Sequence, residues 1–107
     1  MIENQTPIPA LVHQMEVCLR SGYNIRQTLE IAAKDLPEPL ATEIRQTLAD
    51  LDGGTALPTA LEHWLDRAPS PDLDWMLATI KVQLEVGGNL ADKFRLLGQM
   101  MEKRRGI

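Results

Sequence analysis

Apolar residues recur along the chain at the three- and four-residue spacing of amphipathic helices. The first such stripe contains Leu11, Met15 and Leu19, each four residues from the next. No segment keeps the two-residue alternation that is typical of a half-buried strand. The pattern therefore predicts six helices, near residues 9–21, 24–36, 39–52, 56–68, 72–86 and 89–104.

Residues that start and stop helices separate these stripes. Asn24, Asp72 and Asn89 precede or open the second, fifth and sixth stripes, and each is expected to accept N–H groups of the first turn as an N-cap. Gly22 and Gly88 follow the first and fifth stripes. We expect Gly22 or Gly88 to adopt a positive φ angle at the end of its helix, because glycine has no Cβ to clash there.

The order of turn residues repeats along the chain. Gly22, Gly54 and Gly88 lie 32 and 34 residues apart, and Pro37 and Pro69 lie 32 residues apart. The repeated unit is a helix, a glycine turn, a second helix and a proline break. Because short connections favour antiparallel neighbours, the fold class is predicted to be all-α, an antiparallel six-helix bundle built from three αα-hairpins.

The fifth stripe differs from the others because it is apolar on two sides. One side carries the core-type residues, including Leu84, and the other carries Trp75, Ala78, Val82 and Val86. A helix of this kind lies either at the centre of a fold or at an interface. A central position in the bundle is the favoured interpretation.

Composition limits the class of protein. The length of 107 residues is enough for one domain and too short for two, so we expect a flexible lead-in at 1–8 and a single helical domain at 9–107. A net charge of −4 argues against a nucleic-acid-binding surface. The single Cys excludes a disulfide framework and fits a reducing compartment. No stretch is long and apolar enough to predict a membrane span.

Candidates for catalysis or metal binding are few. His13 and Glu16 share a helix face at a spacing of three residues, as do His63 and Asp66, and each pair could supply half of a metal site. A surface ion pair or a partly exposed histidine is the strongly favoured explanation of each pair. Cys18 lies on an apolar face, which favours a buried, inert thiol. No Gly-rich phosphate loop is present. Taken together, these candidates predict no catalytic, cofactor or metal site.

Two groups of charges could contact partners. The basic cluster Lys103-Arg104-Arg105 ends the last helix, where it complements the helix dipole or could lie next to anionic lipid. A solvated face of the second and third helices is the other group, and its residues are a candidate partner face: Arg26, Glu30, Lys34, Glu43 and Arg45.

The order of these features resembles a known family. Residues 85–91, Glu-Val-Gly-Gly-Asn-Leu-Ala, are similar to the second half of the type II secretion system F domain, and Tad-type (Flp) pilus platform proteins typically carry such a turn. Residues 19–30 are similar to the family's opening motif, and Pro-Glu-Pro-Leu at 37–40 to its proline break. The resemblance covers about residues 11–105. Its helix-turn motif residues here are Gly22, Asn24, Gly54, Gly87, Gly88, Asn89 and Leu90.

The resemblance implies a non-enzymatic cytoplasmic domain of an inner-membrane assembly platform, in type II secretion or in type IV (Tad/Flp) pilus biogenesis. The implied location is the cytoplasmic face of the bacterial inner membrane, reached through transmembrane helices that this chain lacks. The implied partners are the assembly ATPase and other proteins of the machine, with a homodimer as a further candidate. No cofactor and no nucleic acid are implied.

Two other functions stay open at this point. The 32–34-residue period would suit a helical-repeat adaptor, a solenoid-like protein-binding module. A small metal-dependent helical enzyme would require His13, Glu16, His63 and Asp66 to converge in a bundle core.

We predict that the purified chain neither binds nor hydrolyses ATP, because no residues in a suitable pattern cradle a phosphate. A coupled-enzyme assay and a fluorescent-nucleotide titration would check this. Turnover that persists through a further purification step would favour an enzyme instead.

Overall fold

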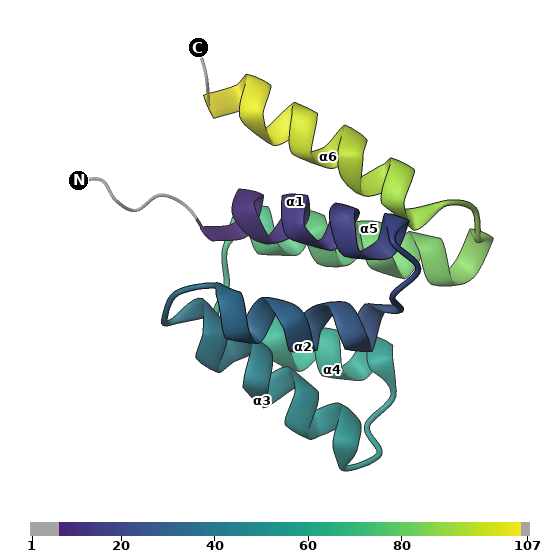
Figure 1. Cartoon of the computed structure of the whole chain (residues 1–107). Helices are drawn as coiled ribbons and strands as arrows, with labels where there is room; N and C mark the ends of the chain where they lie inside the picture. The colour runs from purple at the N-terminus through teal and green to yellow at the C-terminus, as the bar shows by residue number, and fades with distance from the viewer. Residues whose placement is uncertain (1–6, 106–107) are drawn as a thin grey trace.

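The computed structural model describes residues 7–105, and all the regular secondary structure in this range is α-helical (Figure 1). The predicted all-α class with six helices is confirmed. The helices are α1 Pro7–Arg20, α2 Ile25–Asp35, α3 Leu40–Asp52, α4 Leu57–Arg67, α5 Pro71–Val86 and α6 Leu90–Arg105.

Polar side chains begin three of the helices. The Asn24 side chain accepts the N–H of Gln27, whose own side chain accepts the N–H of Asn24, which forms a capping box. Asn89 Oδ1 accepts the Asp92 N–H at 3.0 Å, so both predicted asparagine caps are confirmed. The third cap, that of α5, belongs to Ser70, whose hydroxyl accepts an N–H of the first turn.

Two predicted helix starts need correction. Asp72 is not the N-cap of α5, because Pro71 occupies the first helical position, where its missing N–H costs nothing, and so places Ser70 at the cap. Helix α1 begins at Pro7, two residues before the predicted start, and Ile8 is buried. The rest of the predicted lead-in, residues 1–6, lies outside the described residues.

Glycines end three of the helices with positive φ angles. Gly22 and Gly88 have φ angles of 102° and 101°, which confirms the prediction, and Gly54 (99°) and Gly87 (77°) share this conformation. After α1 and after α3 the glycine donates its N–H to the carbonyl three residues back. The next residue donates to the carbonyl five residues back. This pattern is a Schellman motif, which satisfies carbonyls that the helix end leaves free.

Helix α1 lies inside the bundle. It packs against α2 on one side and α6 on the other, with α5 behind it in the view of Figure 1. Helix α6 lies against α1 at Gly98, where an added Cβ would be 3.6 Å from a methyl carbon of Val12, an ordinary van der Waals distance. The largest fully buried side chains come from all six helices: Trp64, Phe94, Leu11, Met15, Leu29, Leu40, Ile44, Leu61, Leu73, Met76, Leu77 and Ile80.

The contact between α1 and α6 argues against a solenoid. In a solenoid each repeat contacts only its neighbours along the chain. Here the first and last helices pack directly on each other, and so they close the fold. The structure therefore does not support the helical-repeat adaptor.

Helix α5 does not occupy the central position that its two apolar sides suggested. One side, with Leu73, Met76, Leu77 and Ile80, is buried in the core. The opposite side is open, and Val82 is 49% exposed. Leu84, predicted to belong to the core, is 48% exposed, because the last turn of α5 extends beyond α1 (Figure 1). The interpretation of α5 as the central helix is wrong.

We expect Gly54→Ala to lower the free energy of unfolding by about 1–2 kcal/mol, because an L-residue is strained at its positive φ angle. Gly53→Ala is the matched control. Gly53 has a φ angle of −81°, and the nearest atom to its added Cβ would be 3.4 Å away. Urea unfolding of both variants checks this, and equal losses at the two positions would contradict it.

Candidate functional site

The predicted partner face on α2 and α3 carries charges that the fold holds in ion pairs. Arg26 Nε lies 3.2 Å from the Glu30 carboxylate one turn along α2, and Arg26 also pairs with Asp52 on α3. Arg45 on α3 lies 2.8 Å from a Glu38 oxygen. These side chains are exposed, so each pair contributes little to stability but limits where the cations can point.

Glu43 and Lys34, the other two residues predicted for this face, differ from each other. Glu43 is half-buried, and its carboxylate accepts a hydrogen bond from the indole Nε1 of Trp64 at 3.2 Å. Since Trp64 is fully buried, this bond satisfies a polar group that would otherwise be costly to bury. Glu43 therefore joins α3 to α4. Lys34 is exposed near the end of α2.

The basic cluster at the end of α6 is partly used inside the fold. Arg104 pairs with Asp72 at the start of α5, and its guanidinium carbon lies 5.5 Å from the ring centroid of Trp75. This distance is within the range of a cation–π contact. Lys103 is exposed, and the side chain of Arg105 lies outside the described residues. Arg104 thus fastens the end of α6 to α5.

The helix-turn motif between α5 and α6 is held by two side chains that sequence reasoning missed. Lys93 Nζ donates to Gln83 Oε1 at 2.6 Å and to the Gly87 carbonyl at 2.8 Å. Gln83 Nε2 donates to the Gly88 carbonyl at 2.7 Å. Gln83 and Lys93 stand four residues before and five residues after this glycine pair, a spacing that places both near the turn. Leu90, the last residue of the motif, is buried. These hydrogen bonds and the burial of Leu90 together fix the conformation of the connection between α5 and α6.

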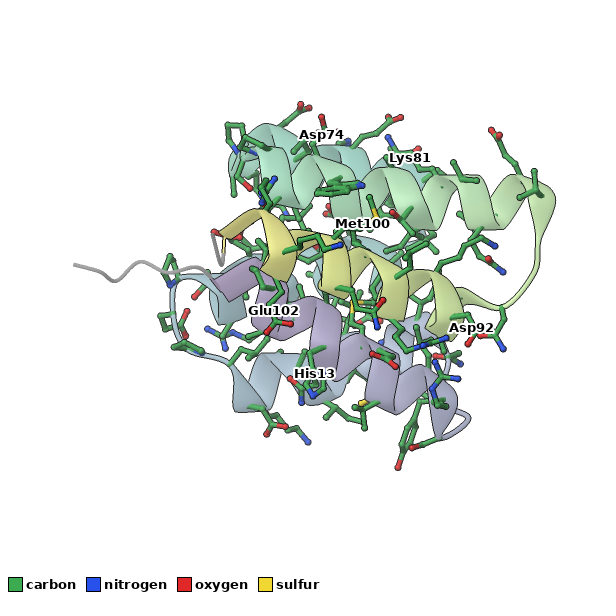
Figure 2. The ribbon with its side chains drawn as sticks, turned by 90° about the horizontal axis from the view of Figure 1, so that it is seen from above. His13, Asp74, Lys81, Asp92, Met100 and Glu102 are labelled. Atoms are coloured by element: carbon green, nitrogen blue, oxygen red, sulfur yellow. The ribbon has the colours of Figure 1, made fainter. Side chains whose placement is uncertain are left out.

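An apolar groove runs between α5 and α6 on the outer surface. We call its apolar lining the α5–α6 face, which consists of Trp75, Ala78, Val82, Leu96 and Met100. Leu96 is 57% exposed and Met100 is 44% exposed. Figure 2 shows the two helices side by side, with Met100 on α6. Sequence reasoning identified the α5 part of this face but not its continuation on α6. No pattern of polar residues around Leu96 and Met100 marks these two side chains as exposed.

The residues proposed for a metal site do not come together. His13 and His63 are both exposed, on α1 and α4, and His63 Nδ1 lies 3.4 Å from the Asp50 carboxylate. Within residues 7–105 no group of three or more His, Cys, Asp or Glu side chains is arranged to hold a metal ion. The structure therefore gives no support to the metal-dependent enzyme. Cys18 is buried, and burial raises the pKa of its thiol, which disfavours the reactive thiolate.

Within residues 7–105 no helix is both long enough and apolar enough to cross a membrane.

Comparison with family models decides the relationship of the chain. The model for type II secretion system (T2SS), protein F, matches residues 11–107, a range that includes most of α1 and all of α2–α6. The chain belongs to the type II secretion system protein F family. Members of this family are structural components of inner-membrane secretion and pilus machinery. Searches of curated proteins and of solved structures find no significant match.

The pairing of Glu38 with Arg45 predicts a specific acid response. The hydrogen bond from Arg45, followed by that from Thr42, lowers the pKa of Glu38 from 4.5 to about 2. Because the folded pKa is below the ordinary value, the stabilisation is present above pH 4.5 and is lost as the pH falls towards 2. Arg45→Gln should therefore raise the Glu38 pKa and destabilise the fold slightly at neutral pH, since both side chains are exposed, and this difference from the wild type should shrink as the pH falls towards 2.

Carboxyl NMR titration of Glu38, together with thermal unfolding at several pH values, measures both effects. Arg95→Gln is the control, because Arg95 is an exposed arginine on α6, far along the chain from this pair. A Glu38 pKa that stays low in Arg45→Gln would contradict the assignment.

Proposed function

We propose that this chain is a cytoplasmic domain of an inner-membrane assembly platform that contacts the assembly ATPase of a type II secretion or Tad/Flp-type pilus machine. The family match over residues 11–107 is the observation that carries this proposal. The Gly-Gly-Asn-Leu turn at residues 87–90, which resembles the Tad-type turn, gives it further support.

We assign the ATPase contact to the predicted partner face, called the α2–α3 face below, whose residues are Arg26, Glu30, Lys34, Glu43 and Arg45. Among the described residues, none of the large apolar side chains that are exposed belongs to α2 or α3. A platform that binds and releases a motor repeatedly needs a contact of moderate affinity, and transient interfaces are no more apolar than ordinary protein surface. The charges of Arg26, Lys34 and Arg45 would add electrostatic steering and specificity to such a contact.

The arrangement of the helices supports an orientation. Helix α6 lies on one side of α1, and α2 and α3 lie on the other (Figure 1). We place the end of α6, with Lys103, nearer the anionic lipid, where a cation gains on the order of 1 kcal/mol. The α2–α3 face is then turned away from the membrane, towards the cytoplasm and the motor.

Lys34→Glu is expected to weaken binding of the chain to the assembly ATPase of its own organism by about threefold to tenfold, as for a charge at the rim of an interface. Biolayer interferometry at low and high salt measures this. Arg95→Glu on α6 makes the same charge change on a different helix and should bind like the wild type. Equal losses in both variants, or no salt dependence, would contradict the assignment of the α2–α3 face.

A further inference from the structure

Four helices and the connection between α4 and α5 surround a pocket of about 540 Å³ at one end of the bundle. This is the end at which α1 begins and α6 ends, on the left in Figure 1. Buried side chains from α1, α3 and α5 contribute to the lining, namely Ile8, Leu40 and Leu73. Pro69 and Pro71 line the pocket from the connection between α4 and α5. The volume is in the range of small-ligand pockets, and most of the lining is apolar.

Three charged side chains also line the pocket, and their charges do not cancel. Asp72 and Arg104 form an ion pair with each other. Glu43 is half-buried, and its Oε1 accepts a hydrogen bond from the neutral indole N–H of Trp64. Among the described side chains, no lysine or arginine forms an ion pair with Glu43. Two carboxylates and one guanidinium therefore leave the pocket with one uncompensated negative charge.

The backbone around the pocket offers acceptors more readily than donors. Three of the lining residues are prolines, which have a carbonyl oxygen but no N–H. Helices α3 and α5 both begin here, but N–H groups of their first turns are already used within the chain. A Glu38 oxygen accepts the N–H of Thr42, and the Ser70 hydroxyl accepts the N–H of Leu73. The lining therefore suits an occupant that donates hydrogen bonds.

We propose that this pocket binds a lysine or arginine side chain of a partner protein, with its aliphatic stem against the buried apolar side chains and its cationic head beside Glu43. Both side chains combine an apolar stem with a charged head, which matches this lining. The indole N–H of Trp64 occupies Oε1 of Glu43, so the cation binds at Oε2. Because Glu43 is only half-buried, the cation keeps part of its hydration, which limits the cost of desolvation.

The pocket adjoins the α2–α3 face, because Glu43 belongs to both. A partner that docks on the exposed charges of this face can therefore place a side chain in the pocket. In many interfaces a few side chains that fill pockets supply most of the affinity, while the surrounding charges supply orientation. The chemistry of the pocket is set by its own lining, so the proposal goes beyond the ATPase contact and does not require it.

A negatively charged occupant is a poorer match for this pocket. Among the described residues that line it, Arg104 is the only cation. Arg104 already pairs with Asp72, and its guanidinium lies over the ring of Trp75. A carboxylate or phosphate in the pocket would also be repelled by Glu43.

NMR titration of the ¹⁵N-labelled chain with n-hexylamine tests the proposal, because this amine is protonated at about pH 7, as a lysine side chain is. Uncharged n-hexanol and anionic hexanoate have similar alkyl chains and are the matched probes. Hexylamine should bind with a millimolar dissociation constant and shift the amide signals of Leu40, Ala68 and Leu73. The indole N–H signal of Trp64 should shift with them, since this group shares the Glu43 carboxylate. Hexanol should bind about tenfold more weakly than hexylamine, and hexanoate more weakly still.

Glu43→Gln separates the charge from the structural role of this residue. Glutamine keeps an oxygen that can accept the Trp64 N–H, so the fold is retained. This variant should bind hexylamine about tenfold more weakly and hexanol as the wild type does. Glu85→Gln is the control, because it removes the same charge from an exposed position at the other end of α5. Ala68→Leu enlarges a lining side chain and should weaken the binding of hexylamine and hexanol alike.

Hexylamine that does not bind, or that shifts signals elsewhere on the chain, would overturn the proposal. Equal affinities for hexylamine and hexanol would do the same, as would an affinity for hexylamine that is unchanged in Glu43→Gln. Tighter binding of hexanoate would assign the pocket to an anionic occupant and also overturn it. If Ala68→Leu fails to fold, the comparison of Glu43→Gln with Glu85→Gln decides. No ATPase is used, so this result is independent of the test of the proposed function.

Discussion

The burial of α1 is the interaction on which the rest of the structure depends. Leu11, Val12 and Met15 have no exposed surface, and α1 contacts helices from both ends of the chain. Gly98 on α6 lies next to Val12, where the last helix packs on the first. Helix α1 thereby connects the α5–α6 hairpin to α2, and the contact of α4 with α5 connects the same hairpin to α3 and α4.

The sequence predicted the fold well because local signals and burial agree over most of the chain. The helical period located all six helices, and Asn24, Asn89 and Gly22 have the capping roles that their chemistry indicated. The prediction for Asp72 failed because Pro71, next to it, fixes the start of α5 one residue earlier. This competition between neighbouring signals is visible in the sequence once the preference of proline for the first helical position is weighed.

The surface was harder to predict because its contacts join residues that are far apart in the sequence. The bond from Trp64 to Glu43 spans 21 residues, and that from Arg104 to Asp72 spans 32. Periodicity reports that α5 has two apolar sides, but it contains no information on whether another helix of the same chain covers the second one. That depends on how α5 and α6 pack, and their packing leaves the groove with Trp75 and Met100 open. Arg26, Lys34 and Arg45 are exposed on α2 and α3, and the sequence could not tell the half-buried Glu43 apart from them.

The fastening of α6 at both of its ends has a consequence for recognition. At the turn, Lys93 and Gln83 hold the backbone of Gly87 and Gly88, and about four helical turns away Arg104 holds the start of α5. These two sets of contacts fix the separation of α5 and α6, and with it the width of the groove between them. A molecule that binds in this groove contacts two helices whose positions are already fixed, so little conformational entropy is lost in ordering them. The glycine turn at residues 87–90 thereby helps to keep this surface rigid along its whole length.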